Sequence, residues 1–292
     1  MLPSRDTLVT YPDGALEAES AVLHVAPAGD GLVAVVTETT SFHPVDAAWP
    51  DQPADTGSLV VDGTEVPVVD AVVAATDGTG LHLGADIPVR KGTEGWTFLV
   101  AHLVRDDAAI AEGDAVTVRA DASARRALSI GHTACHAAAL ALNGALAGHW
   151  SKPAREDALG APDFDGIAIA SSRILPDGSV DVYRLNKSLR RAGFDTAAVA
   201  ADELGGLAAS VTATIAEWAA AGATVRIDRD GDGLTDRRYW VAELPGGTAR
   251  IACGGTHAGS LAELGDVRVE FEAGDDAGTP VLTMRTHAAP AR

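Results

Sequence analysis

The chain has 292 residues, of which 47% are hydrophobic and 22% charged, a composition that excludes a disordered protein and suits two domains. Its formal net charge of −19 disfavours partners that are themselves polyanions, such as nucleic acids or anionic membranes. No apolar run approaches the roughly 18 residues that span a bilayer, and the first residues lack the pattern of a secretory signal. With two cysteines and no disulfide framework, we expect a protein of the reducing cytoplasm.

From about Leu16 to Arg119 the sequence predicts strands alone. Short segments rich in Val, Leu and Thr alternate with turns that contain Gly and Asp, which is typical of a small β-barrel or sandwich. The predicted strands are Ser20–Val25, Gly31–Thr37, Ser58–Val61, Glu65–Val73, Thr97–Leu103 and Asp114–Val118.

The segment Thr40–Gly57 interrupts these strands with a long loop that contains three prolines, His43, Trp49 and Asp51. Long ordered loops are often functional. A surface excursion that packs one tryptophan explains the segment equally well, so the spacing alone leaves both interpretations open.

The composition changes near Asp121, where Asp121 or Ser123 can cap a helix rich in Ala and Leu. We place a domain boundary here, which gives a β-barrel domain at 1–120 and a second domain at 121–292. The second domain mixes strands with two substantial helices and lacks a regular βαβ alternation, so its expected class is α+β. Its predicted elements after the first helix are a hairpin of Gly166–Ser171 and Ser179–Tyr183, a helix over Thr196–Ala221, and strands at Thr224–Asp228, Tyr239–Leu244, Ala249–Ala252, Val267–Glu272 and Val281–Arg285.

Two distant pairs of residues predict a zinc site. His132 and His136 are four residues apart at the start of the Ala-rich helix, so their side chains share a face and lie roughly 5–6 Å apart at Cβ. Cys253 and His257 repeat the interval at the end of a predicted strand, where two glycines between them allow a tight turn. Imidazole and thiolate are ligands that Zn²⁺ favours, and four of them complete a tetrahedron. The alternative is a pair of buried core histidines and an ordinary buried cysteine.

Cys135 competes with Cys253 as the thiolate because it follows His132 by three residues on the same helix. An apolar helix flank is a common place for a buried free cysteine, so we interpret Cys135 as a packing residue.

The acidic segment Asp228–Asp236 resembles the front of a calcium-binding EF-hand loop. Tyr239 stands where the bidentate glutamate is needed, and a strand rather than a helix precedes the segment. A hairpin turn exposed to solvent explains it better.

Basic residues are few and gather in two places, YRLNKSLRR at 183–191 and the arginines at 226, 229, 237 and 238. A local positive face on an acidic protein can hold a phosphate backbone, with an affinity that falls as salt rises. Solvated faces paired with nearby carboxylates are the alternative. If nucleic acid binds, the candidates are Arg184, Lys187, Arg190 and Arg191.

With HTACH and CGGTH in view, the chain resembles the alanyl-tRNA editing family, the freestanding relatives of the editing domains of alanyl- and threonyl-tRNA synthetases. The segment TSFHP at 40–44 followed by DQPADTG at 51–57 is similar to that family's TxFYP…GGGQPxDxG, and LAELG at 261–265 is similar to its trailing EIG. The resemblance covers about residues 20 to 285.

The resemblance implies a small β-barrel followed by a zinc-containing α+β editing domain that hydrolyses the ester between a wrong amino acid and tRNA. It implies that the metal ligands are His132, His136, Cys253 and His257. Thr40 matches the position that helps to recognise the hydroxyl of the mischarged amino acid, and Gln52 matches the glutamine of the glycine-rich loop. We count Thr40, Gln52 and His132 as candidate catalytic residues.

Where the family has three glycines before the glutamine, this chain has the bulkier segment Ala47–Asp51. The expected substrate is therefore tRNA carrying either serine or an unusual hydroxylated amino acid such as fluorothreonine, as in a specialised branch of the family. Two other classes of function stay open: a tRNA-binding module with structural zinc, and a zinc hydrolase of a small ester or amide.

Overall fold

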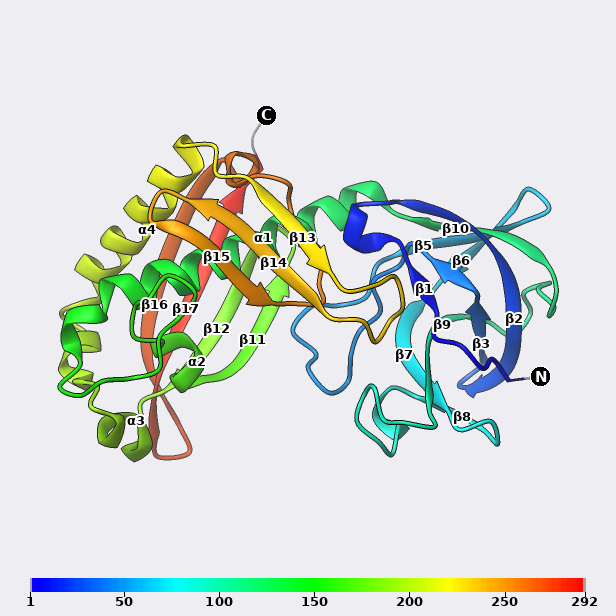
Figure 1. Cartoon of the computed structure of the whole chain (residues 1–292), viewed down its shortest axis with the longest axis horizontal. Helices are drawn as coiled ribbons and strands as arrows, with labels where there is room; N and C mark the ends of the chain where they lie inside the picture. Colours follow the sequence, from blue (N-terminus) through cyan, green and yellow to red (C-terminus); the bar gives the residue numbers. More distant parts are fainter. Residues whose placement is uncertain (1, 291–292) are drawn as a thin grey trace. The chain divides into compact units, whose positions relative to one another are not determined.

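The computed structural model describes residues 2–290 and shows an α+β protein that is richest in strands (Figure 1). The chain divides into two units. The first runs through Arg125 and also takes in Arg229–Arg238 and Gly254–Thr256, while the second holds the remaining residues. The segment 229–238 belongs to the first unit because it hydrogen-bonds with the N-terminal segment, where Val9 N donates to Asp232 O at 2.9 Å and Leu234 N donates to Thr7 O at 2.9 Å.

The first unit contains an eight-stranded sheet in the order β6-β5-β10-β2-β3-β9-β7-β8, together with the short parallel pair β1 and β4. The strands are β1 (Leu8–Val9), β2 (Glu17–Gly29), β3 (Leu32–Thr37), β4 (Thr39–Thr40), β5 (Gly57–Val61), β6 (Thr64–Val68), β7 (Asp70–Thr76), β8 (Leu81–Leu83), β9 (Thr97–Arg105) and β10 (Ala115–Ala120). Two 3₁₀ turns, η1 (Tyr11–Asp13) and η2 (Gly84–Asp86), complete it.

The barrel expected for this part of the chain is wrong, because within residues 2–290 the sheet stays open with β6 and β8 at its edges. The long strand β2 pairs with β10 through its first half and with β3 through its second half, and its register shifts between Val22 and His24. Pro67 in β6 has no N–H to donate, which suits an edge strand. The segment expected as one strand over Glu65–Val73 is divided at Val69, whose N–H donates to Leu103 O in β9.

The second unit contains two antiparallel sheets and the two longest helices (Figure 1). One sheet has the order β11-β12-β17-β16 and the other the order β13-β14-β15. The strands are β11 (Ile169–Leu175), β12 (Gly178–Arg184), β13 (Val225–Arg229), β14 (Arg238–Leu244), β15 (Gly247–Ala252), β16 (Asp266–Asp276) and β17 (Thr279–Ala289). The helices are α1 (Ala122–Ala145), η3 (Ala147–His149), α2 (Phe164–Ala168), α3 (Lys187–Ala192), η4 (Thr196–Val199), α4 (Leu204–Ala220) and η5 (Leu261–Leu264).

Helix α1 begins where the sequence predicts it, since Asp121 Oδ1 accepts the N–H groups of Ser123 and Ala124 at 2.9 and 2.8 Å. Its Ala and Leu side chains join one apolar cluster with Trp240 of β14 and Tyr183 of β12. At Gly131 the helix lies so close to the hairpin of β11 and β12 that an added Cβ would stand 2.2 Å from Leu175 O. The single glycine before His132 therefore lets α1 reach its place in the core.

The predicted helix over Thr196–Ala221 is confirmed in its second part, α4, which packs against β16. The first part is the 3₁₀ turn η4 followed by a bend. The expected strand Gly166–Ser171 starts late, because α2 occupies its first residues. Among the described residues, no helix has the length and apolarity needed to cross a membrane.

Candidate metal centre

Helix α1 carries the first pair of ligand candidates to one side of the cluster. His132 is 2% exposed, and its ring stacks on that of His136 with centroids 4.9 Å apart. The one-turn spacing on a regular helix produces this stacking. The predicted helix placement of both histidines is confirmed.

The second pair follows directly after β15. Cys253 Sγ lies 3.4 Å from His132 Nε2 and 3.3 Å from His257 Nε2. The candidate ligand atoms of His132, His136, Cys253 and His257 all lie within 4.8 Å of one another, so the structure brings the two distant pairs together within the second unit.

The geometry fits a tetrahedral ion. Zinc bonds of about 2.0–2.3 Å place neighbouring ligand atoms about 3.3–3.6 Å apart, which matches both contacts of Cys253 Sγ. Nε2 of His136 is buried and has no hydrogen-bond partner, a costly state for a polar atom unless an ion accounts for it. Burial also lowers the pKa of His136 to about 4, so its imidazole is neutral and able to ligate at neutral pH. These four residues could hold zinc.

Thr133 contacts His257 and Ala258 on the side of the His257 ring that faces away from Cys253. Its Oγ1 accepts the backbone N–H of Ala258 at 3.0 Å and lies 3.4 Å from Nδ1 of His257. The Nε2 atom of His257 faces Cys253, so its Nδ1 faces away from the cluster toward the threonine. Such contacts fix the orientation and tautomer of a ligating histidine. The sequence gives no signal for this role, because a threonine in an Ala-rich helix is common.

We expect Thr133→Val to weaken zinc binding by about 10–100-fold, since the variant keeps the shape and removes the oxygen that faces His257. Competition with a chromophoric chelator measures the affinity. Thr133→Ser, which keeps the hydroxyl, is the matched control and should bind as the wild type does. Equal affinity in the valine variant would contradict the supporting role.

Gln52 belongs to the first unit and is 1% exposed. Its side-chain amide holds Thr256 twice: Oε1 accepts Thr256 N–H at 3.0 Å and Nε2 donates to Thr256 Oγ1 at 3.0 Å. Thr256 directly precedes His257 in the chain. Gln52 therefore fixes Thr256 within the first unit, and its catalytic role stays a prediction.

Thr40 is fully buried in the first unit, where its Oγ1 lies 2.8 Å from Nε2 of His102. His102 Nδ1 is 3.1 Å from Val35 O, a pure acceptor, so Nδ1 carries the proton and Nε2 accepts the hydroxyl proton of Thr40. Thr40 Oγ1 in turn accepts the N–H of Phe42 at 3.0 Å. Contact with a substrate hydroxyl, which stays a prediction, requires the side chain to become exposed and would use Thr40 as an acceptor.

The buried histidines of the first unit make its stability depend on pH. Burial lowers the pKa of both His43 and His102 from 6.5 to about 4. As pH falls, these histidines therefore bind protons in the unfolded chain before they do so in the folded protein. Their contribution to the unfolding free energy is fully present above pH 6.5 and is lost as pH falls toward 4. At pH 5 each histidine costs about 2 kcal/mol relative to pH 7.

Urea unfolding with chelator present tests this, and the unfolding free energy should decrease between pH 7 and pH 5. His102→Gln, whose amide can keep one donor and one acceptor, should show a flatter dependence. An unchanged slope in this variant would contradict the role of His102.

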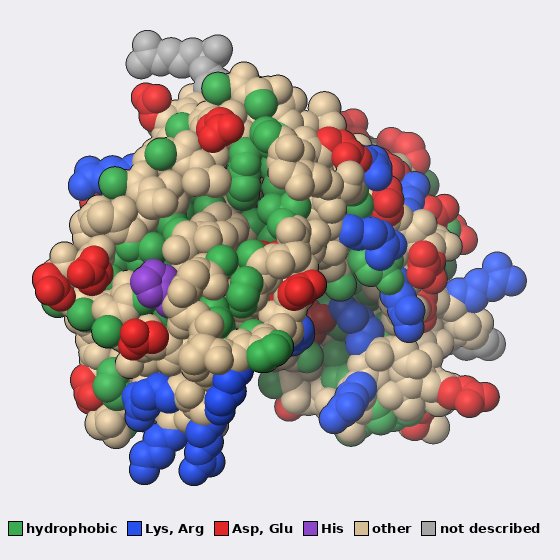
Figure 2. Space-filling model, turned by 60° about the vertical axis from the view of Figure 1, so that its left-hand side comes forward, with side chains coloured by type: hydrophobic (Ala, Val, Ile, Leu, Met, Phe, Trp, Pro, Cys, Tyr) green, Lys and Arg blue, Asp and Glu red, His purple; other side chains and the backbone are tan. Residues whose placement is uncertain are grey.

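The four basic candidates lie at the end of β12 and along α3, in the second unit. Asn186 caps α3 by accepting the N–H of Leu189, and a glycine with φ of 109° ends it. Arg184 reaches Asp276 at 3.7 Å, with both side chains more than half exposed, and Arg190 donates to Leu185 O. On the face drawn in Figure 2, Lys and Arg side chains gather below, over α3. Nucleic-acid binding by this group stays a prediction.

Cys135 is not a ligand of the cluster formed by the described residues. It packs with Leu128 and Ile174, as expected. The interpretation as simple packing is incomplete, because its thiol also donates to the buried carboxylate of Asp181 at 3.5 Å. Burial, and then the negative charge of Asp181, raise the pKa of Cys135 well above its usual value, so it stays a thiol.

The acidic segment Asp228–Asp236 joins β13 and β14 as the predicted turn. Its polar groups serve the fold: Asp236 Oδ2 accepts the N–H of Gly233 at 2.8 Å, and Arg229 pairs with Asp13 and Asp232. The His/Cys cluster is the metal-ligating group found among the described residues, and this segment contributes nothing to it.

Comparison with known sequences places the chain near one kind of enzyme. It is 27% identical over 262 residues to alanine–tRNA ligase of Gluconobacter oxydans, covering 87% of this chain and 25% of the ligase. It is 24% identical over 291 residues to alanine–tRNA ligase of Desulfosudis oleivorans, covering 98% of this chain and 27% of the ligase. No family model matches the chain. The chain thus spans about a quarter of the length of the curated relatives it matches, and nearly all of it is distantly similar to a region of alanine–tRNA ligase.

Proposed function

We propose that the chain is a trans-acting, zinc-dependent aminoacyl-tRNA deacylase, a hydrolase of carboxylic esters acting in the cytoplasm. The observation that carries the proposal is the His/Cys cluster of the second unit, found in a chain similar to a region of alanine–tRNA ligases. Its substrate would be tRNA carrying a wrong hydroxyamino acid, either serine or a threonine analogue such as fluorothreonine.

His132, His136, Cys253 and His257 would hold the zinc ion, which when bound supplies a Lewis acid beside the ester. Thr133 keeps the His257 ring in position through Nδ1. Gln52 holds Thr256 of the first unit through both atoms of its side-chain amide. Thr40 would accept a hydrogen bond from the hydroxyl of the amino acid, because its own proton is committed to His102. A polar group made for a hydroxyl rejects an amino acid that lacks one.

Arg184, Lys187, Arg190 and Arg191 would bind the phosphates of tRNA. The remaining surface is strongly acidic, so these contacts have to overcome a net charge of −19. Binding should therefore weaken steeply as salt rises.

The test is deacylation of tRNAs charged with Ser, Gly, Ala, Thr and fluorothreonine by zinc-loaded protein, with chelated protein in parallel. We expect release of a hydroxyamino acid by the loaded protein and little release of alanine. If none of these esters is hydrolysed by protein with one zinc per chain, the deacylase proposal fails.

A second candidate is a tRNA-binding module with structural zinc. It is favoured by the four candidate ligands, since four protein ligands close a tetrahedron as in structural sites. Retained tRNA binding without turnover, together with unfolding on chelation, would support it. A zinc hydrolase of a small ester or amide is the third candidate, favoured by the acidic surface, and kinetics independent of salt would identify it.

A further inference from the structure

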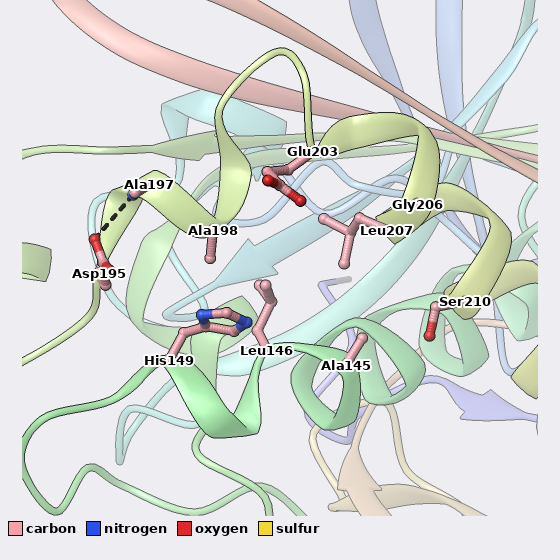
Figure 3. Close-up of a pocket in the computed structure, with 10 residues that line it drawn as sticks. All are labelled: Ala145, Leu146, His149, Asp195, Ala197, Ala198, Glu203, Gly206, Leu207 and Ser210. Atoms are coloured by element: carbon pink, nitrogen blue, oxygen red, sulfur yellow. Dashed lines mark hydrogen bonds between the residues drawn. The ribbon is translucent and has the colours of Figure 1, made fainter.

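A pocket of about 430 Å³ lies in the second unit, at the end of α1 opposite to the one near His132 (Figure 3). It is formed between the end of α1 with η3 on one side and η4 with the start of α4 on the other. Its volume falls within the range of small-molecule sites. The residues that define its chemistry are Leu146, His149, Asp195, Glu203, Gly206 and Leu207.

The pocket combines an apolar floor with acceptors at its rim. Leu146 and Leu207 point toward each other across it, and the ring of His149 stands beside them (Figure 3). Asp195 accepts the N–H of Ala197 at 3.0 Å, and the exposed carboxylate of Glu203 stands apart from it, where α4 begins (Figure 3). A flat ligand with N–H donors on one edge suits these walls.

A short antiparallel pairing connects the pocket with a group of cations. Asp195 N donates to His149 O at 2.9 Å, and Ser151 N donates to Gly193 O at 2.9 Å. Directly after Ser151, Lys152 donates through Nζ to the carbonyl of Arg191, two residues before Gly193, at 2.9 Å. The pocket residues His149 and Asp195 thus lie at one end of this pairing, and Lys152 and Arg191 lie at the other end.

We name Lys152, Lys187, Arg190 and Arg191 the α3 basic patch. Lys152 follows His149 by three residues, which even in an extended chain span no more than about 10 Å. This distance is comparable to that between a nucleobase and the phosphates on either side of it. An apolar floor thus has a group of cations on one side, and sites for single-stranded nucleic acid likewise combine a base-stacking surface with cations that follow the backbone.

We propose that the pocket receives one unpaired guanine base of an RNA strand whose phosphates lie on the α3 basic patch. Guanine presents two adjacent N–H donors, at N1 and N2, and one carboxylate can accept hydrogen bonds from both. On the same edge of adenine, cytosine and uracil, every donor has an acceptor as its neighbour. Glu203 is the carboxylate best placed for this contact, and the His149 ring supplies a face for stacking. The inference rests on the proposed function for the RNA nature of the partner.

The experiment is fluorescence anisotropy at low salt with labelled trinucleotides UGU, UAU, UCU and UUU. We expect UGU to bind at least about fivefold tighter than the others, the smallest discrimination that one bidentate hydrogen-bonded pair gives, since stacking is shared by all four bases. Glu203→Gln should reduce this preference, because an amide offers one acceptor only. Equal affinity for all four trinucleotides would overturn the proposal.

A matched pair of glycine variants distinguishes the effect of filling the pocket from the effect of a substitution in helix α4. Gly205 and Gly206 both lie in α4 with open space around an added Cβ, but Gly206 lines the pocket and Gly205 is absent from its lining. Leucine at either position raises helix propensity. We expect Gly206→Leu to abolish the preference for UGU and Gly205→Leu to retain it. Wild-type binding by Gly206→Leu would refute the pocket.

The double variant Lys152→Gln/Arg191→Gln should weaken all trinucleotides alike and keep the preference, because phosphate contacts carry no sequence information. These binding assays do not depend on ester hydrolysis. A chain that prefers UGU but deacylates nothing would sink the deacylase proposal alone, while an active deacylase without base preference would sink this inference alone.

Discussion

We expect His132→Ala to lose zinc binding and, with it, more than about a hundredfold of the deacylase activity, because removing a ligand exceeds the effect of removing a supporting contact. His132 Nε2 is 3.4 Å from Cys253 Sγ, and its ring lies against those of both His136 and His257. Its loss would therefore remove one of the four candidate ligands and the surface on which the other two rings pack. Metal content by mass spectrometry and release of the amino acid from charged tRNA measure the two effects.

The control is His287→Ala, an exposed histidine in β17 of the same unit, which should keep both zinc and activity. A His132→Ala protein that still holds one zinc per chain would contradict the metal centre. Loss of zinc with full activity would support His132 as a zinc ligand and would show that zinc takes no part in the reaction.

Breaking the buried ion pair between Arg125 and Asp55 should cost about 3–5 kcal/mol of unfolding free energy. Arg125 holds both carboxylate oxygens, through Nε at 2.8 Å and Nη2 at 2.5 Å, and its Nη2 also donates to Ser41 O. Asp55 accepts the N–H of His43 as well. Arg125→Met would leave the Asp55 carboxylate buried with fewer hydrogen-bond donors. It would also remove the contacts of Arg125 with Ser41 and Asp55, which lie near the two ends of the Thr40–Gly57 loop.

Urea unfolding at pH 7 measures this loss. Arg119→Ala is the control, since Arg119 pairs with Glu17 and Glu65 on the surface, where an ion pair contributes little to stability. A similar small change in both variants would show that the buried pair does not hold the loop.

The sequence predicts the metal cluster better than the fold around it. The ligand types and the one-turn spacing are local features, so His132 and His136 on α1 follow from the pattern alone. The assignment of Cys253 rather than Cys135 also agrees with the structure, because Cys135 points to Asp181. The similarity to alanine–tRNA ligases agrees with the resemblance of the motifs but does not distinguish serine from a threonine analogue.

What the sequence does not predict depends on contacts between distant segments. Most strand positions are correct, yet whether the sheet closes depends on how β2 divides its pairing between β10 and β3. The partnership of Arg125 with Asp55 spans 70 residues. His102 and Thr133 have no motif of their own, and their roles come from the neighbours that the fold brings to them.

The two halves of the cluster leave the ribosome at different times. His132 and Cys253 are separated by 121 residues, so at about 5–20 residues per second the histidine pair waits about 6–24 s for its partners. During that interval the hairpin of β11 and β12, which follows α1 closely in the chain and packs against Gly131, is synthesised. The residues of α1 are therefore complete well before the candidate ligand set, which exists in full only after translation has passed His257.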